Sequence, residues 1–94
     1  DINEGRRNAF LEEFNEVVPL VLKEDGCIEY GATIDASTEL ERQAPLRKDT
    51  VTIVEKWSGI EALQAHLDSG HMAAYRERVK DHVAGATLRI LEPA

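Results

Sequence analysis

Residues 54–59 (VEKWSG) and residues 65–72 (AHLDSGHM) decide how this chain folds and which ligands suit it. The first stretch ends an alternating, strand-like pattern at Trp57, the only tryptophan of the chain. The second stretch places two histidines on either side of a Ser-Gly helix break. A tryptophan, a glutamate and two histidines brought together in a protein of 94 residues indicate a pocket for a flat organic molecule.

Apolar side chains at helical spacing predict helices on both sides of the tryptophan strand. The first helix covers residues 4–24, where phenylalanine and valine recur on one side. A second helix covers residues 59–67 and ends at the Ser-Gly break. Ser69 is a suitable N-cap residue, so a third helix is expected over residues 70–83.

Alternation of apolar and polar residues predicts three strands, over residues 27–35, 50–58 and 86–92. The side chains expected to share one face of the first strand are Ile28, Tyr30, Ala32 and Ile34. Those expected to share one face of the second strand are Val51, Ile53, Glu55 and Trp57. The polar residues 36–49 are expected to connect these two strands, with a short helical turn at residues 38–42.

The predicted order of helix, strand, strand, split helix and strand indicates one α+β domain over residues 1–94. A ferredoxin-like domain has the order βαββαβ, with an antiparallel sheet and the helices on one face. Only the first strand of that order is lacking. Residues 1–5 (DINEG) look like the end of a strand and the turn into a helix, so we expect the first strand to precede Asp1.

The composition limits the partners of this chain. A net charge of −7 argues against nucleic acid and anionic membranes, both of which favour basic patches. No apolar run approaches the ~18 residues of a membrane span. Cys27 is the only cysteine, so it forms no internal disulfide and suits a reducing compartment. We therefore expect a cytoplasmic protein.

The small size of the chain favours an oligomer. A chain of about this length buries only roughly 60–65% of the surface that it exposes when unfolded. A second copy that covers the sheet face opposite the helices would relieve this shortage of core. A homodimer formed through the sheet face is therefore expected.

Trp57 and Glu55 lie two residues apart on one strand face, and each has two interpretations. Trp57 either fills the core between sheet and helices, the more common role of an aromatic residue in a small domain, or stacks on an aromatic substrate. A carboxylate on an apolar face needs a partner. Glu55 either pairs with an arginine of the last helix, Arg76 or Arg78, or accepts a proton and orients a histidine.

His66 and His71 are the candidate proton-transfer groups, since imidazole suits general base catalysis near neutral pH. They are five residues apart across a helix break, which is not the i, i+4 spacing of a helical zinc pair. No cysteine nearby completes a set of ligands, so no metal site is expected. For each histidine alone a structural role, as a helix cap or as a hydrogen-bonding group at a subunit boundary, is preferred. For the two histidines together the structural and the catalytic roles are equally favoured.

Tyr30, Tyr75 and Met72 are expected to lie in the core or along the wall of a pocket. A tyrosine ring packs among apolar side chains while its hydroxyl group finds a polar partner, which a phenolic substrate also offers. Cys27 is more typical of a small buried residue than of a nucleophile. No glycine-rich phosphate loop, dinucleotide fingerprint or CxxC pair occurs, so no cofactor is expected.

The chain resembles the antibiotic biosynthesis monooxygenase family over almost its whole length. Four segments carry the resemblance in family order: residues 4–7 (EGRR) leading to Phe10, residues 25–30 (DGCIEY), residues 55–57 (EKW) and residues 65–71 (AHLDSGH). The last segment is similar to the family pattern AHxxSxH and is the most specific of them.

The resemblance implies a ferredoxin-like domain whose sheet pairs with that of a second copy in a dimeric α/β barrel. It also implies a monooxygenase that oxidises a small phenolic, quinol or polyketide-type aromatic with O2 and without metal or flavin. By this analogy His66 or His71 handles the proton and Glu55 orients or tunes one of them. Trp57 and Tyr75 hold the substrate ring. Tyr30 and Met72 complete the expected binding site.

Other functions remain open on this fold, because a fold does not supply a substrate. One subgroup of the family degrades haem, but its tryptophan and histidine positions hold Ala65 and Tyr75 here, so haem is not expected. A non-catalytic dimeric domain that binds a small ligand is one alternative. An isomerase or decarboxylase of the same fold is another.

Overall fold

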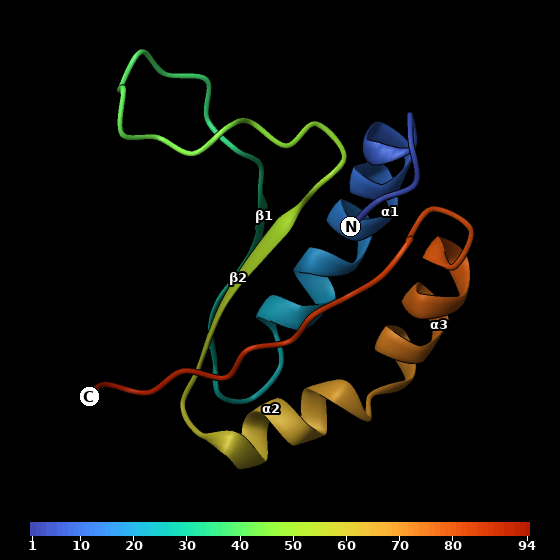
Figure 1. Ribbon diagram of the computed structural model, residues 1–94. Coiled ribbons are helices and arrows are strands. Elements are labelled where there is room, and N and C mark those ends of the chain that lie inside the picture. Colours follow the sequence, from blue (N-terminus) through green and yellow to red (C-terminus); the bar gives the residue numbers. More distant parts are fainter.

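The computed structural model describes residues 1–94 as an α+β domain with all its helices on one side of an antiparallel hairpin (Figure 1). Its elements are α1 (Arg7–Leu22), β1 (Cys27–Thr33), β2 (Thr52–Trp57), α2 (Ile60–Leu67) and α3 (Gly70–Val79). The three predicted helices and the first two predicted strands are confirmed, with ends shifted by a few residues. No helix combines the length and the apolar character needed to cross a membrane.

The core forms where α1 lies between the hairpin and α3. The buried side chains of α1 repeat at helical spacing and are Phe10, Phe14, Val17 and Val21. The ring of Phe14 is fully buried and stacks on Tyr30 of β1, with ring centres 5.3 Å apart. The same ring meets the edge of Tyr75 of α3 at 5.9 Å. Phe14 therefore joins all three layers of the domain.

The hairpin contains one irregularity that changes the predicted face of β1. Tyr30 lies opposite Glu55, but the register shifts between Cys27 and Glu29. This bulge turns Ile28 outward, where 66% of it is exposed, while Tyr30 is buried. The prediction that Ile28 and Tyr30 share a face is therefore wrong.

The alternation predicted for β2 is confirmed. Ile53, Glu55 and Trp57 are partly buried on the side of the helices. Thr52, Val54 and Lys56 are exposed on the opposite side. One face of the hairpin is therefore packed against the core and the other is open.

The predicted strand over residues 86–92 is wrong. Ile2 and Val83 form a single antiparallel bridge, and the chain after residue 83 is exposed and has no regular structure. Residues 2–3 are hydrogen-bonded to two different segments: Ile2 N–H donates to the Asp49 carbonyl group and Asn3 N–H donates to the His82 carbonyl group. A strand needs a paired neighbour along its length, and here the pairing stops after one bridge.

The connection between β1 and β2 contains no helix, and the helical turn predicted at residues 38–42 is reduced to a single hydrogen-bonded turn, in which Gln43 N–H donates to the Leu40 carbonyl group at 3.1 Å. Figure 1 shows this connection projecting away from the helices. Asp35 and Arg47 close its base by a two-pronged ion pair, with 2.7 Å between Oδ1 and Nη2. That contact holds the pKa of Asp35 at about 2, below its ordinary value.

Gly26 makes the turn that brings the end of α1 close to α2. Its φ angle is +82°, and an added Cβ would lie 2.5 Å from Ser58 Oγ and 2.6 Å from Ala62 Cβ. We expect Gly26→Ala to lower the free energy of unfolding by about 3 kcal/mol, since backbone strain and a steric clash add. Urea denaturation measures this loss.

Gly5→Ala is the matched control, because Gly5 has a φ angle of +76° but open space around the added Cβ. It carries the backbone strain alone and should cost about 1–2 kcal/mol. Equal losses in the two variants would contradict the close contact between the Gly26 turn and α2.

Candidate functional site

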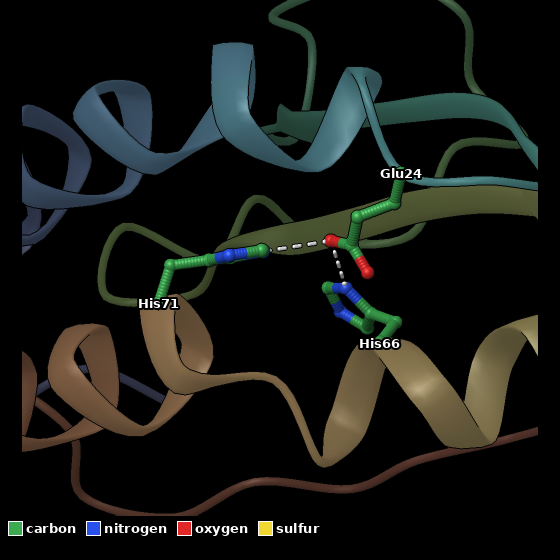
Figure 2. A group of neighbouring side chains, drawn as sticks. All are labelled: Glu24, His66 and His71. Atoms are coloured by element: carbon green, nitrogen blue, oxygen red, sulfur yellow. Dashed lines mark hydrogen bonds and ion pairs between the residues drawn. The ribbon is translucent and has the colours of Figure 1, made fainter.

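The candidate site is a cluster in which one carboxylate joins two histidines (Figure 2). Oε2 of Glu24 lies 2.9 Å from Nδ1 of His66 and 2.9 Å from Nε2 of His71. Glu24 follows the end of α1, His66 is in the last turn of α2 and His71 is in the first turn of α3. The turn after α1, the end of α2 and the start of α3 therefore meet at a single oxygen atom of Glu24.

Ser69 aligns the two histidines. Its hydroxyl group accepts a hydrogen bond from Met72 N–H at 3.4 Å and donates one to the His66 carbonyl group at 2.8 Å. The predicted N-cap is thus confirmed, and it fixes the bend between α2 and α3. Because of this bend, residues five apart in sequence both point at Glu24 (Figure 2).

The carboxylate of Glu24 decides which nitrogen atoms carry protons. Partial burial favours its neutral form, but the hydrogen bonds from His66 and His71 outweigh burial and lower its pKa below the ordinary value. An ionised carboxylate only accepts hydrogen bonds. His66 must therefore donate through Nδ1–H and His71 through Nε2–H, which leaves Nε2 of His66 without a proton when its ring is neutral.

Glu55 and Trp57 lie on the other side of the His66 ring. Trp57 Nε1–H donates to Glu55 Oε1 at 2.9 Å, and the same oxygen lies 3.9 Å from His66 Nε2. The centres of the Trp57 and His66 rings are 4.7 Å apart. The imidazole of His66 is thus held between two carboxylates and against an indole.

The predicted pairing of Glu55 with an arginine of the last helix is wrong. Arg78 pairs with Glu13 at 2.9 Å, and Arg76 donates to the Leu67 carbonyl group at 3.0 Å. Both arginines are exposed on α3, whereas Glu55 faces the buried side of β2. The carboxylate of Glu55 finds its partners in Trp57 and His66 instead.

Tyr30, Tyr75 and Met72 lie in the core, each at most 6% exposed. The Tyr30 ring meets the edge of His66 at 5.3 Å, and its hydroxyl group points at Met72 Sδ, 4.0 Å away. Tyr75 packs against the phenylalanines of α1 instead. Burial raises the pKa of Tyr30 well above its ordinary value and that of Tyr75 to about 12, so both hydroxyl groups are neutral.

The histidine cluster is packed rather than hollow. His66 is 1% exposed, while the His71 side chain is 28% exposed and forms the solvent side of the cluster. One shallow surface hollow lies between the Gly26 turn and the first turn of α2. Another lies between the start of α1 and residues 48–49. Neither hollow includes a histidine.

Glu24 is the member of the cluster that the sequence did not identify. It follows an acidic, exposed helix face and precedes the Asp25-Gly26 turn, which makes it look like one more solvated glutamate. It lies 42 residues before His66, so no local spacing links the two side chains. The only signal is its position before a glycine turn that reverses the chain.

Because the pKa of Glu24 is lowered, the stability that the cluster contributes should depend on pH. Its pKa in the folded protein lies below the ordinary 4.5, so the unfolded chain binds a proton first as the pH falls. Its contribution to stability is present above pH 4.5 and is lost as the pH falls through the native pKa. The free energy of unfolding should therefore fall more steeply in the wild type than in Glu24→Gln between about pH 5 and about pH 3.

Asp35 titrates in both the wild type and Glu24→Gln, so its contribution to the pH dependence of the free energy of unfolding cancels when the two proteins are compared. Denaturant unfolding at several pH values gives the two curves. Parallel curves would show that the folded protein does not favour the ionised form of Glu24, and would contradict the assignment of both histidines as donors.

Comparison with known proteins agrees with this architecture. The family model described as antibiotic biosynthesis monooxygenase matches residues 1–78. The chain is 40% identical over 87 residues to "Probable quinol monooxygenase YgiN" of Escherichia coli K12, a match that covers 93% of this chain and 83% of the relative. The proteins of the same name from Escherichia coli O157:H7 and Shigella flexneri match equally well. The chain therefore belongs to the antibiotic biosynthesis monooxygenase family, whose domains are ferredoxin-like and α+β.

Proposed function

We propose that the protein is a cofactor-independent monooxygenase that oxidises a small phenolic, quinol or polyketide-type aromatic with O2. The observation that carries this proposal is the hydrogen bond between Glu24 Oε2 and His66 Nδ1. A carboxylate that fixes the proton on one nitrogen of a neutral imidazole leaves the other nitrogen without a proton, as a general base requires. The family of the chain and its quinol monooxygenase relatives support the same class of reaction.

The proposed reaction needs one proton acceptor and no external reductant. Nε2 of His66 removes a proton from the substrate, and the electron-rich anion reduces O2 to form a carbon–oxygen bond. Cleavage of the O–O bond in the resulting peroxide leaves one oxygen atom on carbon as a carbonyl group. The other oxygen atom leaves as water, with the proton from His66 and the last hydrogen of that carbon. A CH2 group, present in an anthrone or in the keto tautomer of a phenol, and O2 thus give a carbonyl group and water.

The neighbouring side chains take supporting roles in this proposal. Trp57 stacks on the substrate ring, and Glu55 orients the imidazolium of His66 once it has formed. His71 holds Glu24 in place through its own hydrogen bond. Tyr30, which meets the edge of His66, and Met72 beside its hydroxyl group exclude water from the reacting anion. Tyr75 supports them from the core through Phe14.

We further propose that two copies pair through the open face of the hairpin. Ile28 and Val54 are 66% and 40% exposed there, and a second copy would cover both side chains. We also propose that the protein works in the cytoplasm, because the thiol of Cys27 is free and free thiols are typical of a reducing compartment. Light scattering should give the mass of two chains, and the mass of one chain at micromolar concentration would contradict this pairing.

Oxygen uptake with a panel of hydroquinones and anthrones tests the proposed reaction. In buffer containing a chelator, we expect uptake above substrate autoxidation, and one labelled oxygen atom in the product when ¹⁸O2 is supplied. Turnover without oxygen uptake would indicate an isomerase or decarboxylase. Binding without turnover would indicate a ligand-binding domain. Either result would overturn the monooxygenase proposal.

A further inference from the structure

The cluster that holds the proposed base also has the composition of a metal site. Its donor atoms are Nδ1 of His66, Nε2 of His71 and a carboxylate oxygen of Glu24, and no two of them are more than 4.8 Å apart. They come from the turn after α1, from α2 and from α3, so they converge on one point rather than following one helix face (Figure 2). The five-residue spacing of the histidines would not suit a metal site on one straight helix. The bend at Ser69 separates α2 from α3 and turns both histidines toward the same point.

We propose that Glu24, His66 and His71 bind one Zn²⁺ ion per chain. Two imidazole nitrogens and one carboxylate oxygen form the donor set of zinc sites that keep a fourth position open. Mg²⁺ and Ca²⁺ prefer sets made of oxygen alone. Donor atoms around tetrahedral zinc lie about 3.3 Å apart. Each histidine nitrogen, now 2.9 Å from Glu24 Oε2, therefore needs to move away from that oxygen by about half an ångström. The two histidine nitrogens, at most 4.8 Å apart, need to approach each other by up to about 1.5 Å.

Glu55 provides the outer support that such a site requires. When Nδ1 of His66 binds zinc, the proton of the neutral ring moves to Nε2. Nε2 faces Glu55 Oε1 at 3.9 Å, so the new N–H group has a carboxylate acceptor ready. A carboxylate that accepts a hydrogen bond from a zinc-bound histidine fixes the orientation of the ring and makes its other nitrogen a more basic ligand. The Trp57 N–H group already holds that carboxylate in place.

The site is reached from the solvent side of His71. The His71 and Glu24 side chains are 28% and 15% exposed, whereas His66 is buried behind them. An ion entering on this side meets His71 and Glu24 before His66 and leaves its fourth position toward water. The net charge of −7 attracts cations to the whole molecule.

Zinc binding and the proposed catalysis exclude each other. The ion takes Nδ1 of His66 and shifts the ring proton to Nε2, which is the nitrogen that would accept the substrate proton. Zinc should therefore inhibit oxygen uptake, and EDTA should restore it. The inhibition rests on the proposed function, whereas the binding of zinc does not.

Calorimetric titration of the whole protein with ZnSO4 at about pH 8, after removal of metals by EDTA and dialysis, tests the site directly. We expect one zinc ion per chain and a rise in Tm with added zinc. Glu24→Gln and His71→Ala each remove a ligand and should weaken binding more than about 100-fold. Glu55→Gln removes only the outer support and should weaken binding about 10–100-fold.

His82→Ala is the control, since His82 is the third histidine and contacts Arg6 rather than the cluster. It should leave zinc affinity unchanged. The proposal is overturned if the wild type binds no zinc, or if binding persists in both Glu24→Gln and His71→Ala. A site that is lost in His82→Ala would also overturn it. A protein that binds zinc as expected but consumes no oxygen would contradict the proposed function alone.

Discussion

His66→Asn is expected to lower the rate of oxygen uptake about 10²–10⁴-fold, the usual contribution of a positioned general base. The asparagine amide N–H group occupies nearly the position of Nδ1 and still donates to Glu24, so the contact between α2 and the end of α1 is kept. It offers no nitrogen that accepts a proton in place of Nε2. The loss should therefore appear in kcat, while circular dichroism shows a folded protein.

His82→Asn is the matched control for this experiment. The same substitution is made at the histidine that lies outside the cluster, where Arg6 is its polar neighbour at 3.5 Å. Oxygen uptake should equal that of the wild type. Equal rates in His66→Asn and the wild type, with both proteins folded, would show that His66 is not the base.

Phe14→Ala is expected to lower the free energy of unfolding by about 3–5 kcal/mol, a large part of the stability of a small domain. Phe14 is fully buried and its ring touches α3 and β1 through Tyr75 and Tyr30. Its removal leaves a cavity where three layers meet, and side chains from three different elements would have to move to fill it. Urea denaturation followed by tryptophan fluorescence measures the loss.

Leu20→Ala on the same helix provides the comparison. Leu20 is 48% exposed, so truncating it removes less buried surface and should cost less than about 1 kcal/mol. A loss in Phe14→Ala as small as that in Leu20→Ala would mean that the core does not centre on Phe14.

The periodic parts of the fold were predictable from the sequence. The buried positions of α1 recur at helical spacing, and those of β2 alternate, because each element buries a single face. The Ser69 cap was predictable because the donor and acceptor are three residues apart. These signals depend on neighbours along the chain.

The parts that the sequence did not predict depend on contacts across the chain. The bulge breaks a regular alternation at residues 27–29, none of which is a glycine or proline that would mark it. Residues 86–92 have the pattern of a strand but no pairing partner beside them. In the candidate site, residue type indicated His66 and His71, and strand alternation placed Glu55 beside Trp57. Glu24 enters through the turn at Gly26 and carries no local signal.

The proton positions on His66 and His71 test the central claim most directly, and a long-range ¹H–¹⁵N spectrum of the metal-free protein at about pH 8 reports them. We predict that His66 carries its proton on Nδ1 and His71 on Nε2, as their hydrogen bonds to Glu24 require. In Glu24→Gln the preference of His66 for Nδ1–H should be lost. A wild-type His66 with its proton on Nε2 would contradict the account, because that nitrogen would then have no capacity to accept a proton from a substrate.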